Sequence, residues 1–270
     1  MKPKIGFIGL GLIGGSIAKA VRQYYPDYEI VAFDKNKETL ALATQESVID
    51  VAATTIDDNF YHCRYLFLCA PVSCNTAYLK QLVRYLDTDC ILTDVGSVKS
   101  SIHREVERLG IEEYFIGGHP MAGSEKSGYA NSKAMLLENA YYVLTPTDKV
   151  SEEKTKAYAE FVQSLKALPI LLDDRTHDYV TGTISHLPHV IAASLVGLVR
   201  DTDTEDELMK SLAAGGFKDL TRIASSSPEV WQQICLSNQK QLSNVLDSYI
   251  RLLVQAKYLV DNKKGHELYN

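Results

Sequence analysis

The chain has few cysteines, and their spacing argues against a Cys-x-x-Cys zinc or redox protein and against a secreted disulfide scaffold. Among its 270 residues five are cysteines, and none stands in the paired Cys-x-x-Cys spacing of zinc sites and redox motifs. Cys63, Cys69, Cys74 and Cys90 lie in or beside apolar runs, where buried free thiols are usual. An odd number of cysteines without paired spacing favours a reduced, cytoplasmic protein over a secreted disulfide scaffold.

The sequence also lacks a surplus of basic residues and a long apolar run. Lysine and arginine number 28 against 34 acidic residues, a net charge of −6. Because no basic stripe is present, a nucleic-acid partner is not expected. No apolar run approaches the roughly 20 residues that a bilayer requires, and the N-terminus enters a strand-like run without a signal peptide pattern. We therefore expect no membrane segment.

What the chain does have is a glycine-rich turn between two apolar runs at its N-terminus. The run that starts at Ile5 leads into Gly9-x-Gly11-x-x-Gly14, and a second run ends at Asp34, about 20 residues later. The first glycine makes a tight turn, the second lets backbone approach a pyrophosphate, and the third lets a helix pack close to a strand. Strand, turn, helix, strand and acid in this order predict a Rossmann dinucleotide-binding domain.

Asp34 indicates which dinucleotide binds. A carboxylate here accepts hydrogen bonds from the adenine-ribose hydroxyls and repels a 2′-phosphate, so the expected cofactor is NAD. Lys35 could partly relieve that repulsion, which keeps NADP as an alternative, or it is simply a solvated turn residue. The residues that we expect to bind the cofactor are Gly9, Gly11, Leu12, Ile13, Gly14, Asp34, Ala70 and Pro71.

Residues 1–150 alternate strand-like and helical patterns. Buried strands are predicted at 65–70 and 90–94, and the apolar runs 114–118 and 141–144 are expected to extend the same sheet. Strands that alternate with helices predict a doubly wound, mostly parallel sheet. The Rossmann domain is therefore assigned to residues 1–150.

The remaining segment, 151–270, is predicted to form an all-α domain. After a short strand-like run at 169–172 its periodicity is helical only, and the segments 178–200 and 239–260 are apolar around most of the helical circumference. Such helices must be buried on several sides, and a small domain achieves this most simply by packing against a partner subunit. We therefore expect a homodimer held together by the helical domain.

His119 is the first candidate for acid–base chemistry. It follows a predicted strand, and the carboxyl ends of strands are where an open α/β sheet presents ligand groups. A neutral imidazole there could take a proton from a substrate hydroxyl as hydride leaves the same carbon, although a loop histidine with a structural hydrogen bond fits the position too. Ser97, after the preceding strand, caps the next helix, orients His119, or does both.

Two histidines and an arginine of the helical domain are further candidates. His186 and His189 share one face of an apolar helix, so they need polar partners, which core neighbours or a substrate cleft would supply. No third ligand at suitable spacing is evident, and we expect no metal. Arg222 follows a glycine pair, and its planar fork matches a carboxylate; a surface salt bridge is the alternative.

Taken together, these segments resemble prephenate dehydrogenase of the tyrosine pathway. The resemblance covers nearly the whole chain and rests on five blocks in the family's order: Gly9-Leu10-Gly11-Leu12-Ile13-Gly14-Gly15-Ser16, Asp94-Val95-Gly96-Ser97-Val98-Lys99, Gly118-His119-Pro120-Met121-Ala122-Gly123-Ser124-Glu125, Ser185-His186-Leu187-Pro188-His189 and Gly215-Gly216-Phe217-Lys218-Asp219-Leu220-Thr221-Arg222-Ile223-Ala224. The last three blocks are far more specific than the nucleotide fingerprint.

The resemblance implies an NAD-dependent oxidative decarboxylation of prephenate to 4-hydroxyphenylpyruvate and CO2. It implies that His119 accepts the proton of the ring hydroxyl, that Ser97 orients His119, and that Arg222 binds a substrate carboxylate. The other residues that it implies at the substrate site are His189, His186, Ser124, Glu125, Gly215 and Asp219, the last two reaching the active site of the neighbouring subunit.

Alternatives remain within and beyond this family. Arogenate or mixed cyclohexadienyl dehydrogenases prefer a side-chain ammonium, and we identify no residue that decides between these substrates. An NAD-binding dimer without catalysis is less consistent with His119 and Arg222. A β-hydroxyacid dehydrogenase would need a lysine in the first helix of its second domain, which no segment matches well. We expect the minimal form, without an ACT domain or a chorismate mutase segment.

Overall fold

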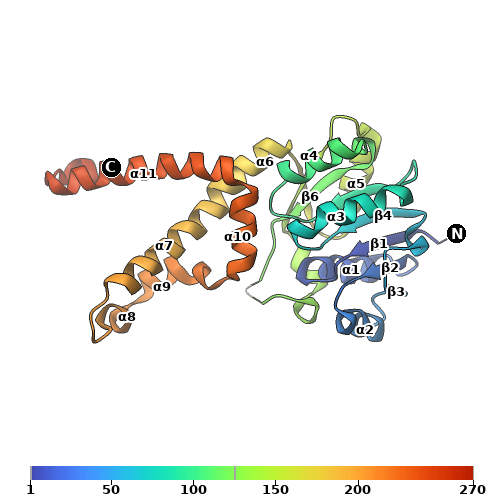
Figure 1. Cartoon of the computed structure of the whole chain (residues 1–270), viewed down its shortest axis with the longest axis horizontal. Helices are drawn as coiled ribbons and strands as arrows, with labels where there is room; N and C mark the ends of the chain where they lie inside the picture. Colours follow the sequence, from blue (N-terminus) through green and yellow to red (C-terminus); the bar gives the residue numbers. More distant parts are fainter. Residues whose placement is uncertain (1, 125, 270) are drawn as a thin grey trace. The chain divides into compact units, whose positions relative to one another are not determined.

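The computed structural model describes residues 2–124 and 126–269, and the chain divides into two compact units, Met1–His177 and Asp178–Asn270 (Figure 1). The division lies later than the boundary that we expected after residue 150. Helix α5 (Glu152–Ser164) and strand β8 (Leu168–Leu171), which we assigned to the second domain, therefore belong to the first unit.

The first unit is built on a parallel five-stranded sheet with the strand order β3-β2-β1-β4-β5. Its strands are β1 (Lys4–Ile8), β2 (Glu29–Phe33), β3 (Val51–Ala53), β4 (Cys63–Leu68) and β5 (Ile91–Asp94). The chain moves from β1 outward to β3 and then returns to add β4 and β5 on the other side. The order therefore reverses between β1 and β4, and the carboxyl ends beside such a reversal form the usual ligand crevice.

Helices cover both faces of this sheet, because successive side chains of a strand point to opposite faces. Phe7 and Phe67 pack on the face that α1 and α5 cover, whereas Leu66 and Leu92 pack on the face that α3 and α4 cover. The helices that precede α5 are α1 (Leu12–Tyr24), α2 (Lys37–Gln45), α3 (Val72–Leu82) and α4 (Ser100–Leu109). The doubly wound, mostly parallel sheet that we predicted is confirmed.

A second, three-stranded sheet lies beside β5. It contains β6 (Ile116–Pro120), β7 (Tyr141–Pro146) and β8, with β6 antiparallel to β7 and β7 parallel to β8. One parallel bridge, between Leu92 and Phe115, links it to the main sheet. The two runs that we expected to extend the main sheet therefore form a sheet of their own.

The second unit consists of helices and connecting turns throughout its described residues, as we predicted for the C-terminal domain. Helix α6 (Asp174–Thr181), a π-helical segment (Gly182–His186) and α7 (Leu187–Thr202) form one continuous helix that starts in the first unit. The helices that follow are α8 (Leu208–Leu212), α9 (Gly215–Thr221), α10 (Pro228–Ser237), α11 (Gln239–Asp261) and α12 (Gly265–Tyr269).

The continuous helix Asp174–Thr202 corrects one expectation from the sequence. Its 29 residues are long and apolar enough to cross a membrane by length and composition alone, and most of its apolar stretch is not buried in the chain. We had expected no such segment. Length and composition alone do not separate a membrane-spanning helix from one that packs against a partner subunit.

Candidate active site

The glycine-rich turn lies between the carboxyl ends of β1 and β4. Gly9 has a φ of +97°, and a Cβ atom there would meet the backbone of Cys69 and Ala70 at 2.9 Å. A Cβ on Gly14 would meet the carbonyl oxygen of Gly9 at 2.5 Å, so only glycine lets α1 pack this closely. A Cβ on Gly11, in contrast, would meet nothing within 4 Å. The turn is therefore tightly packed against the protein at Gly9 and Gly14, whereas at Gly11 it leaves the space that a pyrophosphate needs to approach the backbone.

The start of α1 and Asp34 complete the fit to a dinucleotide. Gly11 is the N-cap of α1 and provides no side-chain cap, so the first N–H groups of the helix, including those of Leu12 and Ile13, keep their capacity to bind an anion. Asp34 lies just after β2, and its carboxylate accepts hydrogen bonds from Leu10 N (2.7 Å) and Asn36 N (2.8 Å). These bonds fix the carboxylate beside the glycine-rich turn.

Ala70 and Pro71 lie on the other side of the strand-order reversal. They follow β4, and Pro71 is the N-cap residue of α3. Since the backbone of Ala70 contacts Gly9, the structure brings this part of the predicted cofactor set together around one turn.

His119 lies in β6 and contacts a second histidine that the sequence analysis did not identify. Its Nδ1 atom is 2.8 Å from Nε2 of His177, and the two ring planes are inclined at 64°. His119 is half-buried, whereas His177, in the first turn of α6, is completely buried. The two residues lie 58 positions apart, so no local pattern connects them. The only signal in the sequence was a histidine at the start of a long apolar helix.

A buried ion pair holds the strand just before His119. The Lys99 ammonium, fully buried, pairs with the Asp94 carboxylate and donates a hydrogen bond to Gly118 O (2.6 Å). The same carboxylate accepts hydrogen bonds from Gly118 N (3.2 Å) and Gly96 N (2.9 Å). Lys99 and Asp94 belong to one of the five sequence blocks, but the sequence does not predict that they support β6, because the contact joins two strands that are distant along the chain.

Ser97 is half-buried in the loop between β5 and α4. Helix α4 begins at Ser100 with Lys99 as its N-cap, so the N-cap interpretation of Ser97 is wrong. The alternative, that Ser97 orients His119, stays a prediction. Ser124 is exposed in the loop after β6, where its hydroxyl accepts a hydrogen bond from Lys126 N (3.2 Å). Glu125 lies outside the described residues.

In the second unit, His189 stacks on Trp231. The ring centroids are 3.6 Å apart and the planes are inclined by 3°. Burial lowers the pKa of His189, opposed by a hydrogen bond to the backbone of Ile223, and its Nδ1 atom is buried without a partner within the described part of the chain. A neutral imidazole with one buried, unsatisfied nitrogen is suited to a polar ligand.

His186 has a different environment. Its Nδ1 atom lies 3.1 Å from Nδ2 of Asn238, which also donates a hydrogen bond to Asp178 O (2.7 Å). The rings of His186 and Trp231 lie edge to face, with an angle of 83° between their planes. His186 thus matches the alternative of a core histidine satisfied by its neighbours, whereas His189 does not.

Gly215, Asp219 and Arg222 lie together on α9 and the turn that follows it. All three are exposed, and Arg222 starts a short 3-10 turn that packs on α7. Because His189 bonds to the backbone of Ile223, the structure brings His189 next to the turn that carries Arg222. Within residues 2–124 and 126–269, no group of three or more histidine, cysteine or acidic side chains could hold a metal ion.

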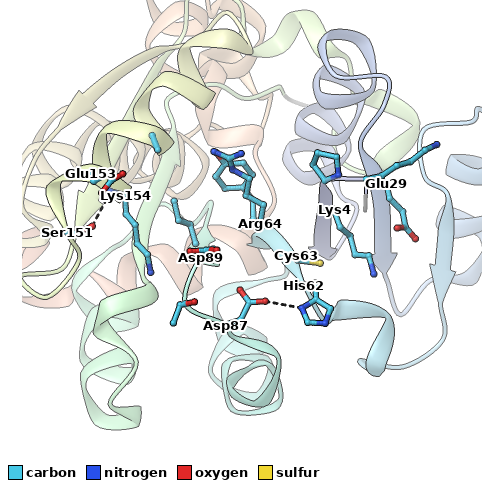
Figure 2. Close-up of a pocket in the computed structure, with 16 residues that line it drawn as sticks. Lys4, Glu29, His62, Cys63, Arg64, Asp87, Asp89, Ser151, Glu153 and Lys154 are labelled. Atoms are coloured by element: carbon cyan, nitrogen blue, oxygen red, sulfur yellow. Dashed lines mark hydrogen bonds and ion pairs between the residues drawn. The ribbon is translucent and has the colours of Figure 1, made fainter.

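A cavity of about 1000 Å³ opens at the amino ends of the strands of the main sheet, away from the glycine-rich turn at their carboxyl ends (Figure 2). It lies where β1 and β4 begin. Charged side chains of both signs line it, among them Lys4, Arg64 and a His62–Asp87 pair at 3.2 Å. Burial raises the pKa of the Cys63 thiol there to about 12, so that thiol is unreactive. None of the described candidate residues lines this cavity.

Comparisons with known proteins agree on one family. Models of the prephenate dehydrogenase nucleotide-binding domain and dimerization domain match residues 17–171 and 173–270. Prephenate dehydrogenase of Bacillus subtilis (strain 168) is 36% identical over 271 residues, covering 100% of this chain and 73% of that protein.

Two solved structures have the same fold over almost the whole chain. The crystal structure of prephenate dehydrogenase from A. aeolicus, in complex with hydroxyphenyl propionate and NAD+, matches with a TM-score of 0.93 at 31% identity, covering 100% of this chain and 94% of that one. Arogenate dehydrogenase from Synechocystis matches with a TM-score of 0.87 at 31% identity, covering 98% and 95%.

Proposed function

Since the chain belongs to the prephenate dehydrogenase family, we propose that it oxidatively decarboxylates prephenate to 4-hydroxyphenylpyruvate and CO2 with NAD. The observation that carries this proposal is the half-buried His119 imidazole, held by a hydrogen-bonded ring on one side and by the Lys99–Asp94 pair just before it. A base fixed on a strand of the nucleotide-binding unit suits proton removal coupled to hydride loss.

His119 is the proposed general base. Its Nε2 atom accepts the proton of the hydroxyl on ring carbon C4, while its Nδ1 atom stays bonded to His177. The chemistry that NAD supplies when bound is acceptance of the hydride from C4. Loss of the ring carboxylate as CO2 then makes the ring aromatic, which renders the overall reaction essentially irreversible. Ser97 is the proposed second contact that orients His119.

The proposed cofactor contacts are the open backbone at Gly11, the start of α1 and Asp34. The proposed substrate contacts are the residues that the resemblance implies. Arg222 binds a carboxylate of the substrate, and His189, with His186 near it, lines the pocket. Ser124 and Glu125 are assigned to its mouth, and Gly215 and Asp219 to the neighbouring subunit's site.

The protein is proposed to act as a homodimer. Helix α11 exposes Leu252 and Val254, and α7 exposes Leu198, each by more than half of its surface. Large apolar side chains left uncovered in this way favour an interaction surface, and the family model that matches this unit is a dimerization domain. A cytoplasmic location is proposed as well, because all five cysteines are free thiols.

A second candidate substrate is arogenate. The Synechocystis arogenate dehydrogenase matches this chain at the same identity as the A. aeolicus prephenate dehydrogenase, which binds hydroxyphenyl propionate, a compound without an amino group. Prephenate is preferred because the relative that covers the whole chain at 36% identity is a prephenate dehydrogenase.

The test is to supply NAD with prephenate and with arogenate separately and to follow the absorbance of the reduced cofactor. Prephenate should give the higher kcat/KM, and His119→Asn should lower kcat by about 10²- to 10⁴-fold with NAD affinity nearly unchanged. The matched control is His62→Asn, an exposed histidine at the far edge of the sheet, which should leave kcat unchanged. No reduction with either substrate contradicts the proposal.

A further inference from the structure

The contact between His119 and His177 permits two arrangements of protons. A hydrogen bond between Nδ1 of one imidazole and Nε2 of the other, at 2.8 Å, needs one N–H and one lone pair. If His119 donates from Nδ1, its Nε2 atom keeps a lone pair. If His177 donates from Nε2, neutral His119 carries its proton on Nε2 instead. These two tautomers of His119 have opposite abilities to act as a base.

Only the first arrangement fits a base at Nε2 of His119. A neutral imidazole that already bears a proton on Nε2 can donate to a hydroxyl but cannot accept its proton there. In the first arrangement the completely buried His177 offers the lone pair of its Nε2 atom to the His119 ring. A neutral His177 with its own proton on Nδ1 is then the acceptor of the His119 Nδ1–H.

The same contact becomes stronger during the reaction. When Nε2 of His119 gains the substrate proton, the ring becomes an imidazolium, and its Nδ1–H donates a charge-assisted hydrogen bond to His177. His177 neither gains nor loses a proton in this step. An interaction that strengthens only as charge develops lowers the barrier without tightening substrate binding, so its removal acts on kcat rather than on KM.

We propose that His177 is the positioning residue of His119: as a buried acceptor at Nδ1 it fixes the His119 tautomer that leaves Nε2 free to take the substrate proton. The catalytic half of this inference rests on the proposed function, whereas the tautomer does not. His177 lies in the first turn of the continuous helix that also carries His186 and His189 further along the chain.

Two substitutions of His177 separate the effect of its hydrogen-bond acceptor from the effect of its side-chain volume. His177→Gln places an amide oxygen as many bonds from the backbone as Nε2, so it can accept the same hydrogen bond. His177→Met has the same reach but no comparable acceptor. His177→Met should lower kcat by about 10- to 100-fold, the loss of a charge-assisted hydrogen bond, with the KM for prephenate and the affinity for NAD changed less than twofold. His177→Gln should restore most of kcat.

The matched control is His103→Met. His103 is half-buried, its Nε2 atom lies 2.9 Å from Thr145 Oγ1, and it lies beside Gly117, two residues before His119 in the same strand. It should keep kcat within about twofold of the wild type. A loss of kcat in His103→Met equal to that in His177→Met would show that β6 is merely sensitive to repacking and would overturn the proposal.

The tautomer itself is read directly by nitrogen NMR of protein labelled in its histidine rings, with the His119 signals assigned from His119→Asn. In the wild type the Nδ1 of His119 should be protonated and the Nε2 unprotonated, and His177→Met should shift this population toward the other tautomer. A wild-type His119 with its proton on Nε2 overturns the proposal even if His177→Met does not fold. If neither prephenate nor arogenate is oxidised, the proposed function fails while this spectrum still decides the role of His177.

Discussion

The two units of the molecule are built in opposite ways. In the first, apolar clusters fill both faces of the main sheet, from Ile5 on one side to Phe115 on the other. In the described part of the second, the buried apolar side chains are Ala192, Leu242 and Val245, and the buried polar side chains are Asp178, Thr181, His186, His189 and Asn238. The second unit thus buries polar groups and leaves most of its apolar side chains uncovered.

Because of this difference, the two units differ in the source of their stability and in the groups that they offer to a ligand. Burial of apolar surface contributes about 25 cal/mol per Å², so the first unit can be stable through its own core. The second unit has little buried apolar surface within one chain, and in the proposed homodimer a partner subunit would cover more of it. In the proposed function, the first unit accordingly offers backbone positions that its core fixes, and the second offers side chains such as His189 and Arg222.

The largest effect is expected where the second unit is uncovered. Leu252→Asp places a charge on the exposed apolar face of α11, where a dimer would bury it without a partner, and should convert the dimer to monomer in sedimentation velocity. Met135→Asp in the first unit is the matched control, because Met135 is 64% exposed and Leu252 62%. The control should remain dimeric. A Leu252→Asp protein that stays dimeric at assay concentration would refute the idea that this face is the interface.

The second prediction concerns the interior of the first unit. Lys99→Met leaves the Asp94 carboxylate buried without its cation, which should lower the free energy of unfolding by about 3–5 kcal/mol. Urea unfolding followed by circular dichroism measures the change, and the fluorescence of Trp231, the sole tryptophan, reports on the second unit. Arg108→Met breaks an exposed pair with Glu105 and should leave the transition unchanged. Equal transitions in both variants would mean that the buried pair contributes no more than a surface pair.

A third prediction tests whether substrate recognition belongs to the second unit. Arg222→Gln should raise the KM for prephenate by about 10- to 100-fold, because a desolvated carboxylate loses its charge-assisted partner, while the affinity for NAD stays constant. Arg200→Gln, an exposed arginine of α7 paired with Asp201, is the control and should not change KM. An unchanged KM in Arg222→Gln would return Arg222 to the surface-salt-bridge interpretation.

The first unit could be predicted closely because its signals are local. Asn36 caps α2 and Ser151 caps α5, each by accepting hydrogen bonds from backbone N–H groups two or three residues later. The glycine pattern determines a turn of a few residues, and it places Gly9 and Gly14 where a Cβ would clash. Periodicity gives the element type, but it does not give strand partners, which is why β6 and β7 were placed in the wrong sheet.

The features that the sequence did not predict depend on contacts between distant segments. The His119–His177 and Lys99–Gly118 hydrogen bonds join residues 58 and 19 positions apart, and no spacing rule relates them. The π-helical segment before Pro188 was missed because a proline in a helical pattern indicates a kink but not its geometry. The apolar helix Asp174–Thr202 was predicted only from residue 178 to 200, since its first residues are polar.

The smallest effect is expected for the specificity of the cofactor, because Asp34 has two functions. Its carboxylate holds Leu10 N and Asn36 N and is also the group that would repel a 2′-phosphate. Asp34→Ala removes both functions, so activity with NAD should fall. The ratio of kcat/KM for NADP to that for NAD should rise, by about 10-fold for one like-charge contact removed.

Asp34→Asn separates the two functions, since its amide oxygen can still accept one backbone hydrogen bond without the charge. Asp34→Asn should therefore shift the ratio as far as Asp34→Ala does but keep more activity with NAD, and neither variant should alter the KM for prephenate, in contrast to Arg222→Gln. A wild-type protein that already prefers NADP would mean that Lys35 outweighs Asp34, and a change in prephenate KM would mean that cofactor and substrate recognition are not divided between the two units.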